Sequence, residues 1–143
     1  MFMDFKNHGY LKLIIGCMFS GKTTELIREK EKWEAIKRDV LLINFNEDTR
    51  YGNDDYVYSH TKQKSSCIKL SKLGDLDEKI FNNYSIIMIN EGQFFTDLKK
   101  YVTYWVNNLK KYVVVCGLDG DFERNPFGDM INLIPHSDEI IKT

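Results

Sequence analysis

The stretch that decides the fold is Gly16-Cys17-Met18-Phe19-Ser20-Gly21-Lys22-Thr23. It matches the pattern G-x-x-x-x-G-K-(S/T), and it stands between an apolar run at 10–15 and a segment rich in helix formers at 23–37. In this context the pattern is a P-loop, in which backbone N–H groups surround phosphates and the following helix N-terminus adds partial positive charge. An ordinary glycine-containing turn is the alternative, but pattern and context agree. We therefore predict a site for the phosphates of ATP or a similar nucleoside triphosphate.

The rest of the sequence alternates short apolar runs with longer amphipathic segments. This order indicates strand-helix-strand units and a mostly parallel sheet. We predict an α/β, P-loop NTPase-like fold with flanking helices in a single domain, since 143 residues with 43% hydrophobic content fit one core. Ligands of such sheets bind at the carboxyl ends of the strands. The predicted strands are 10–15, 40–45, 85–89 and 112–116, the predicted helices are 23–37, 76–81 and 97–109, and 46–64 is predicted to be a flexible active-site segment.

Composition excludes several classes of partner. The net charge of −1 gives no electrostatic reason to expect nucleic acid or an anionic membrane. No apolar run reaches the roughly 18 residues of a transmembrane helix, and the N-terminus does not resemble a signal peptide, so we expect a cytoplasmic protein. The three cysteines, Cys17, Cys67 and Cys116, have no metal-ligand spacing and are expected to be reduced and mostly buried. Cys17 lies in the P-loop, but phosphoryl transfer needs no thiol.

Four charged side chains and one hydroxyl group have defined chemistry in a nucleotide site. Lys22 would reach the β- and γ-phosphates, and the Thr23 hydroxyl would ligate Mg²⁺. Glu91 follows an apolar run, where P-loop enzymes place the acid that acts on magnesium or on the nucleophile; the alternative is an acid at a helix N-terminus. Arg50 could stabilise charge on the transferred phosphoryl group, and Asp48 could hold metal-bound water, although both residue types are common on solvated loops. Four phenylalanines near the strand ends could stack on a base or belong to the core: Phe94, Phe95, Phe122 and Phe127.

Five blocks of sequence carry a resemblance to a known family. They are GCMFSGKTTELIR (16–28), DTRYG (48–52), NEGQFF (90–95), GLDGDFERNPFG (117–128) and NLIPHSDEIIK (132–142). In this order they resemble the thymidine kinases of the cellular and poxviral type. The resemblance implies transfer of the γ-phosphate of ATP to the 5′-hydroxyl of thymidine or deoxyuridine with Mg²⁺, by a homotetramer or dimer.

The resemblance also implies residue roles. Glu91 becomes the general base, with Lys22 and Arg50 as the other catalytic residues, and Thr23 and Asp48 hold Mg²⁺, partly through water. The contacts to ATP and magnesium fall on Gly16, Cys17, Met18, Phe19, Ser20, Gly21, Lys22, Thr23, Asp48, Thr49, Arg50, Asn90, Glu91, Gly92 and Gln93. The nucleoside pocket falls on Met18, Phe94, Leu118, Phe122 and Phe127.

The chain departs from the family pattern at several places. Asn90 replaces the usual aspartate before the glutamate, Cys17 replaces a common proline, and Asp121 replaces a small residue. The sequence ends at Thr143, before the family's zinc-binding segment and the lasso that closes over the base, so we expect no zinc ligands and a more open pocket. These departures leave a second interpretation open, a nucleotide-binding module without efficient catalysis. An unrelated P-loop ATPase or nucleoside monophosphate kinase would carry an arginine-rich lid, which the sequence lacks.

Overall fold

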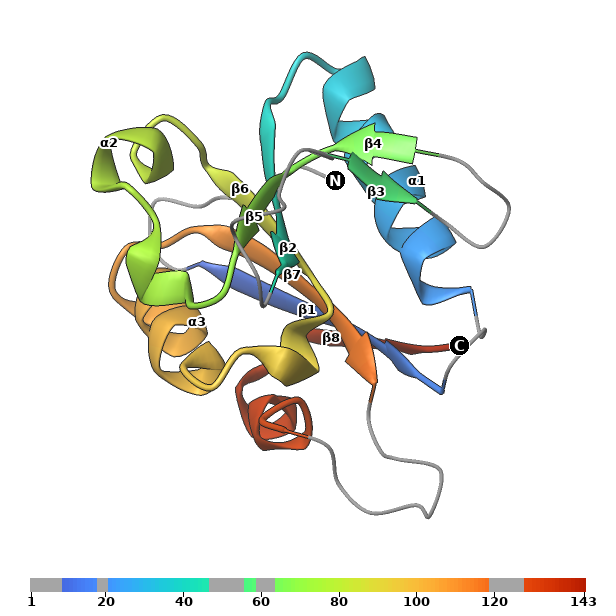
Figure 1. The fold of residues 1–143 in the computed structure, drawn as a ribbon, viewed down its shortest axis with the longest axis vertical. Helices are drawn as coiled ribbons and strands as arrows, with labels where there is room; N and C mark the ends of the chain where they lie inside the picture. Colours follow the sequence, from blue (N-terminus) through green and yellow to red (C-terminus); the bar gives the residue numbers. More distant parts are fainter. Residues whose placement is uncertain (1–8, 18–20, 47–55, 59–63, 119–127) are drawn as a thin grey trace.

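A computed structural model describes residues 9–17, 21–46, 56–58, 64–118 and 128–143. A six-stranded sheet forms its centre, in the order β5-β2-β6-β7-β1-β8, and every pairing in it is parallel (Figure 1). The strands are β1 (Tyr10–Gly16), β2 (Val40–Phe45), β5 (Ile68–Leu70), β6 (Ile86–Asn90), β7 (Tyr112–Leu118) and β8 (Glu139–Lys142). The predicted α/β fold with a parallel sheet and flanking helices is confirmed.

Helices cover both faces of the sheet. The helix α1 (Lys22–Ala35) lies on one face and α3 (Leu98–Asn107) on the other (Figure 1). The shorter helical segments are η2 (Leu73–Asp75), α2 (Glu78–Phe81), η3 (Gly92–Phe94) and η4 (Ile131–His136), and β3 (Tyr56–Tyr58) pairs with β4 (Lys64–Ser66) in a separate antiparallel ribbon. Helices on both faces leave the central strands with no face toward water.

Strand alternation builds two separate cores. On β6, Ile86 and Met88 pack in the cluster on the α1 side, whereas Ile87 and Ile89 pack in the cluster on the α3 side. All four are at most 1% exposed, and burying each such side chain contributes about 1.5–3 kcal/mol. Strands buried on both faces read as continuous apolar runs, which is why the sequence predicted β1, β2, β6 and β7 to within two residues at each end.

Other predicted elements were wrong in part. Residues 56–58 form β3 inside the segment expected to be irregular, and 47–55 and 59–63 lie outside the described residues. The predicted helix at 76–81 shortens to α2, because Asp77 caps it by accepting a hydrogen bond from the Lys79 N–H. The predicted helix at 23–37 ends at Ala35, and Lys37 already has a positive φ of 62°. The strand β8 and the turn η4 were not predicted.

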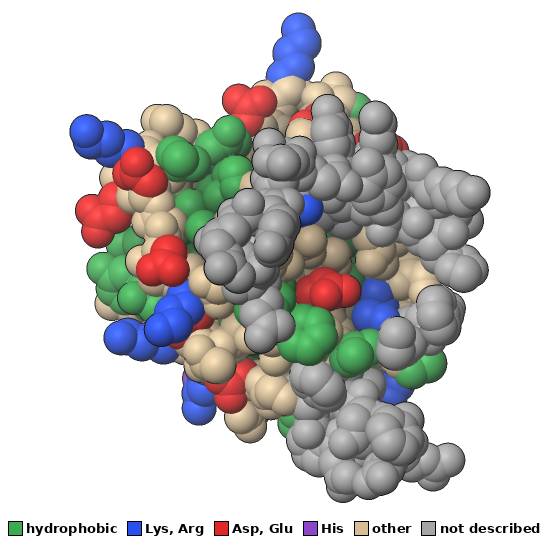
Figure 2. Space-filling view, in the orientation of Figure 1, with side chains coloured by type: hydrophobic (Ala, Val, Ile, Leu, Met, Phe, Trp, Pro, Cys, Tyr) green, Lys and Arg blue, Asp and Glu red, His purple; other side chains and the backbone are tan. Residues whose placement is uncertain are grey.

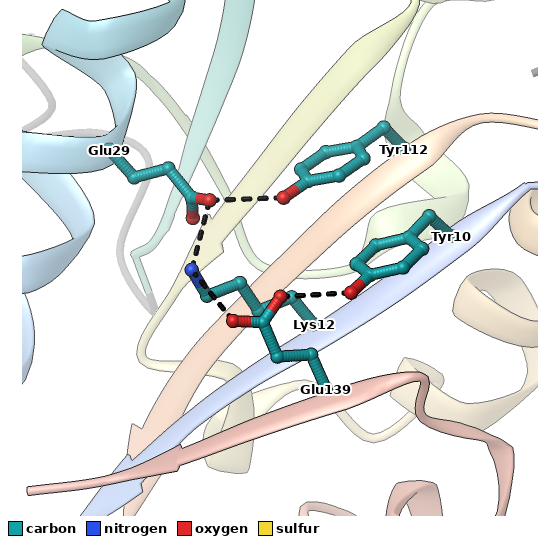
Figure 3. A network of polar contacts seen from close by, with 5 residues as sticks. All are labelled: Tyr10, Lys12, Glu29, Tyr112 and Glu139. Atoms are coloured by element: carbon teal, nitrogen blue, oxygen red, sulfur yellow. Dashed lines mark hydrogen bonds and ion pairs between the residues drawn. The ribbon is translucent and has the colours of Figure 1, made fainter. Parts of the chain in front are cut away.

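A polar network links α1 to three strands on the side of the sheet that α1 covers. The Lys12 ammonium lies 3.1 Å from Glu29 Oε1 and 3.5 Å from Glu139 Oε2, and it is 12% exposed (Figure 3). Tyr10 donates to Glu139 at 2.9 Å, and Tyr112 donates to Glu29 at 3.0 Å. One ammonium thus offsets part of the charge of two carboxylates, while the second oxygen of Glu29, Oε2, is buried without a hydrogen-bond partner among the described residues. The network fixes α1 against the sheet and holds β8 beside β1.

The described residues place side chains of both charges on the surface that Figure 2 shows. On the face that Figure 2 shows, acidic and basic side chains of the described residues alternate and form no patch of one sign. Within the described part of the chain, no helix has the length and apolar character needed to cross a membrane.

Candidate active site

The candidate site lies where four neighbouring strands end. The strands β2, β6, β7 and β1 are adjacent and parallel, so their carboxyl ends meet at one edge of the sheet. They end at Phe45, Asn90, Leu118 and Gly16. Ligands of open α/β sheets bind at this edge. The topology therefore brings together those predicted site residues that the structure describes.

The described parts of the P-loop are the end of a strand, a left-handed glycine and the start of a helix. The strand β1 ends at Gly16, and α1 begins at Lys22. Gly21 lies at the helix N-terminus with a φ of 91°, a left-handed conformation that favours glycine. The Lys22 ammonium donates to the Cys17 carbonyl at 2.6 Å, which holds the cation near the end of β1. Thr23 follows in the first helical turn, where free backbone N–H groups and the helix dipole attract anions.

Glu91 has both an unusual backbone and an unusual environment. It directly follows β6 with φ 58° and ψ 42°, a left-handed conformation that costs a non-glycine residue about 1–3 kcal/mol. Partial burial of the carboxyl group raises its pKa above the ordinary value, and the nearby Lys22 ammonium partly lowers it again. Its side chain makes no capping hydrogen bond to η3, so the structure gives no support to a purely helix-capping acid. A carboxylate with a raised pKa is a stronger proton acceptor.

Asn90 is buried and paired with a residue that the sequence did not single out. It is 6% exposed, and its Nδ2 donates to Asn44 Oδ1 at 3.1 Å. Asn44 lies directly opposite Asn90 in the register of β2 and β6. A polar residue near the end of an apolar strand was the available signal, but the partner could not be identified without the strand order.

The turn after Glu91 is attached to β7 by Gln93. Its side chain is 6% exposed, and its Oε1 accepts a hydrogen bond from the Leu118 N–H at 3.0 Å. Gly92 packs closely enough that a Cβ would lie 2.6 Å from Val115 Cγ1. At Gly117 a Cβ would lie 2.5 Å from Gln93 Oε1. The Gln93 side chain thus binds the protein backbone and holds the turn, and its contact with the cofactor stays a prediction.

The phenylalanines at this edge divide between surface and core. Phe94 is 39% exposed, and its ring centroid lies 5.2 Å from that of Phe45. Phe95 is 1% exposed, so it belongs to the core. The remaining predicted site residues lie outside the described residues: Met18, Phe19, Ser20, Asp48, Thr49, Arg50, Phe122 and Phe127, together with the variant position Asp121.

The three cysteines, all of which the structure describes, form no disulfide bond. Cys116 is buried, and burial raises the pKa of its thiol to about 12. Cys67 is partly buried, but Cys17 is exposed, so the expectation of mostly buried thiols was wrong for the P-loop cysteine. Among the described residues, no group of three or more histidine, cysteine, aspartate or glutamate side chains gathers in a way that could hold a metal ion.

Comparison with known proteins identifies the family. The thymidine kinase family profile matches residues 9–143. The chain belongs to the thymidine kinase family. It is 40% identical over 136 residues to the thymidine kinases of raccoon poxvirus, monkeypox virus and vaccinia virus, covering 95% of this chain and 75% of each relative. Membership of the thymidine kinase family makes the chain a phosphotransferase, with ATP as the phosphate donor and a nucleoside as the acceptor. The resemblance predicted from the sequence blocks is confirmed.

Proposed function

We propose that this chain transfers the γ-phosphate of ATP to the 5′-hydroxyl of thymidine or deoxyuridine and releases the nucleoside monophosphate. The observation that carries the proposal is that the Lys22 ammonium lies near enough to Glu91 to lower the pKa of its carboxyl group. The two charges interact electrostatically at the same edge of the sheet, although the residues come from different elements. A proton acceptor therefore lies within electrostatic range of the cation of the proposed phosphate-binding loop, an arrangement that suits phosphoryl transfer to a hydroxyl group.

Glu91 is the proposed general base. As the 5′-oxygen attacks the γ-phosphorus, its proton passes to the Glu91 carboxylate, and the bond between the γ-phosphorus and the bridging oxygen of ADP breaks. The raised pKa of Glu91 improves its basicity, while the residue's exposed surface leaves it accessible to a nucleoside. General base catalysis of this kind contributes about 10²–10⁴-fold to the rate.

Lys22 and the N-terminus of α1 are the proposed binding groups for the phosphates. The cation already contacts a loop carbonyl, so a phosphate oxygen has only to replace that carbonyl as acceptor. Arg50 is proposed to stabilise charge on the transferred group, an assignment that rests on the sequence resemblance.

The residues at this edge fit Mg²⁺ bound together with ATP. The Thr23 hydroxyl in the first turn of α1 would supply one oxygen ligand, and Asp48 is proposed to act partly through water. Magnesium prefers one or two protein oxygens plus phosphates and waters, so the lack of a carboxylate cluster among the described residues fits that preference. When bound, the ion neutralises charge on the phosphates.

The proposed nucleoside pocket uses Met18, Phe94, Leu118, Phe122 and Phe127. Support from the described residues comes from Phe94, whose ring is exposed at the strand-end edge and rests on Phe45. Aromatic faces stack on bases with little dependence on base identity, so this contact would contribute affinity more than selectivity.

We further propose that the 143 residues form a single kinase domain that assembles as a homodimer or homotetramer in the cytoplasm. Within the described residues β8 is an edge strand, and exposed isoleucines lie on it and on η4 at Ile140, Ile131 and Ile134, which favours a covered surface. Cysteines that form no disulfide bond fit a reducing compartment. Light scattering tests the assembly.

One observation favours a second function, a nucleotide-binding module without efficient catalysis. Asn90 is buried and neutral where a carboxylate would strengthen magnesium binding. Calorimetry with ATP and a phosphate-transfer assay separate the two functions. Under either one, Lys22→Ala should weaken ATP binding strongly, and unchanged affinity would remove the P-loop assignment. Only the kinase produces thymidine monophosphate in a Glu91-dependent reaction.

A further inference from the structure

Asn44 and Asn90 project into the phosphate-binding side of the sheet. On β6, Met88 belongs to the cluster on the α1 side and Ile89 to the cluster on the α3 side, so the next residue, Asn90, returns to the α1 side. The strand β2 alternates in the same way, which places Asn44 on that side too. Both amides therefore lie on the face that carries the helix of the P-loop.

The hydrogen bond between them has a direction. Asn90 Nδ2 donates and Asn44 Oδ1 accepts, at 3.1 Å. The nitrogen and oxygen of an amide lie on opposite sides of its carbon, so the Asn90 carbonyl oxygen points away from β2. The strands on that side of β6 are β7 and β1, and β1 leads directly into the P-loop.

Without Asn44, an asparagine amide could rotate by half a turn at little cost, because its two ends have nearly the same shape. The rotated amide would present N–H groups toward the phosphate site. Such donors repel a cation and cannot accept a hydrogen bond from metal-bound water. The acceptor oxygen of Asn44 favours the orientation that presents the carbonyl oxygen.

We propose that Asn44 is a positioning residue for phosphoryl transfer: it holds the Asn90 amide so that the Asn90 carbonyl oxygen faces the bound phosphates and accepts hydrogen bonds from the hydrated Mg²⁺ that accompanies ATP. The inference rests on the proposed function, since it names a further residue of that site. It also explains how an uncharged residue serves at position 90, because a fixed carbonyl oxygen supplies the acceptor that a freely rotating amide would supply only part of the time.

The test measures how much Mg²⁺ strengthens ATP binding, as the ratio of the dissociation constants of ATP without and with Mg²⁺. Asn44→Leu removes the acceptor at similar volume. One neutral hydrogen bond is worth about 0.5–1.5 kcal/mol, so the ratio should fall about 2- to 12-fold, while ATP binding without Mg²⁺ stays unchanged. Asn44→Asp keeps an acceptor and cannot donate, so its ratio should not fall. Asn107→Leu makes the same chemical change at an exposed position of α3 and should leave the ratio at the parent value.

A double-mutant cycle separates positioning from simple loss of structure. If Asn44 acts through Asn90, Asn44→Leu should have no further effect on the ratio in an Asn90→Ala background. An equal additional fall in that background overturns the proposal, and so does an unchanged ratio in a folded Asn44→Leu protein. If Asn44→Leu does not fold, a marked fall in Asn44→Asp overturns it instead. A chain that binds Mg²⁺ and ATP but transfers no phosphate would contradict the proposed kinase function alone. The ratio of the ATP dissociation constants without and with Mg²⁺ would still test the pairing of Asn44 with Asn90.

Discussion

Replacing Gln93 by leucine tests how the turn after Glu91 is held to the sheet. Gln93 is 6% exposed, and its Oε1 is the acceptor for the Leu118 N–H at 3.0 Å. Leucine has a similar volume but no acceptor, so the main loss is the backbone hydrogen bond. An amide left without its partner at a buried position costs about 1–3 kcal/mol. Because Leu118 itself is only partly buried, we expect a loss of about 1–2 kcal/mol in the free energy of unfolding.

Urea unfolding followed by tryptophan fluorescence measures this loss, since Trp33 and Trp105 report on the two faces of the sheet. Asn107→Leu is the control, and as an exposed substitution it should change stability by no more than about 0.5 kcal/mol. Gly117→Ala disturbs the same bond from the other side, because its Cβ would lie 2.5 Å from Gln93 Oε1. The two substitutions should therefore be non-additive. This reasoning is refuted if the Gln93→Leu protein is as stable as the control and its free energy of unfolding has an unchanged slope against urea concentration.

Three further predictions concern the site and its pH dependence. In the pH profile of kcat/KM, the apparent pKa of the acidic limb should lie above the ordinary glutamate pKa of 4.5, because burial raises the pKa of Glu91. An apparent pKa at or below 4.5 would contradict the environment described for Glu91. Lys22→Ala should weaken ATP binding at least tenfold by calorimetry, by an order-of-magnitude estimate for one charge-assisted contact, whereas Asn107→Leu should not change it. Burial and the bond to Glu139 raise the pKa of Tyr10 from 10.0 to about 12, so folding favours the protonated phenol, and the stability that this provides below pH 10 is lost as pH rises toward 12. In urea titrations between pH 10 and pH 12, the Tyr10→Phe protein should therefore lose less free energy of unfolding than the parent. Equal losses in the two proteins would count against the network.

The parts of the fold that the sequence predicted are those whose signal is local. The central strands are buried on both faces, so each reads as an uninterrupted apolar run, and the P-loop is recognisable from its own spacing. The edge strand β8 gave no such signal, because it has two apolar residues between charged ones and is held by pairing with β1 and by the Glu139 contacts. A four-residue strand of that composition resembles a solvated loop.

The missed parts of the site depend on contacts between distant residues. Asn44 and Asn90 are 46 positions apart, and only the order and register of β2 and β6 bring their amides together. The bond from Leu118 to Gln93 likewise needs β7 beside the turn after β6. Glu91, by contrast, could be predicted from its place after an apolar run, although its raised pKa follows from burial that no sequence pattern reports.

The most direct test of the account is transfer of labelled phosphate from ATP to thymidine by this chain in the presence of Mg²⁺, measured beside Glu91→Gln. Glutamine keeps the size of glutamate but cannot accept the proton, so we expect thymidine monophosphate from the parent and about 10²-fold less or lower from the variant, with equal ATP affinity in both. Equal product from parent and variant would remove Glu91 from the mechanism. No product from a folded chain that binds ATP would contradict the kinase function itself.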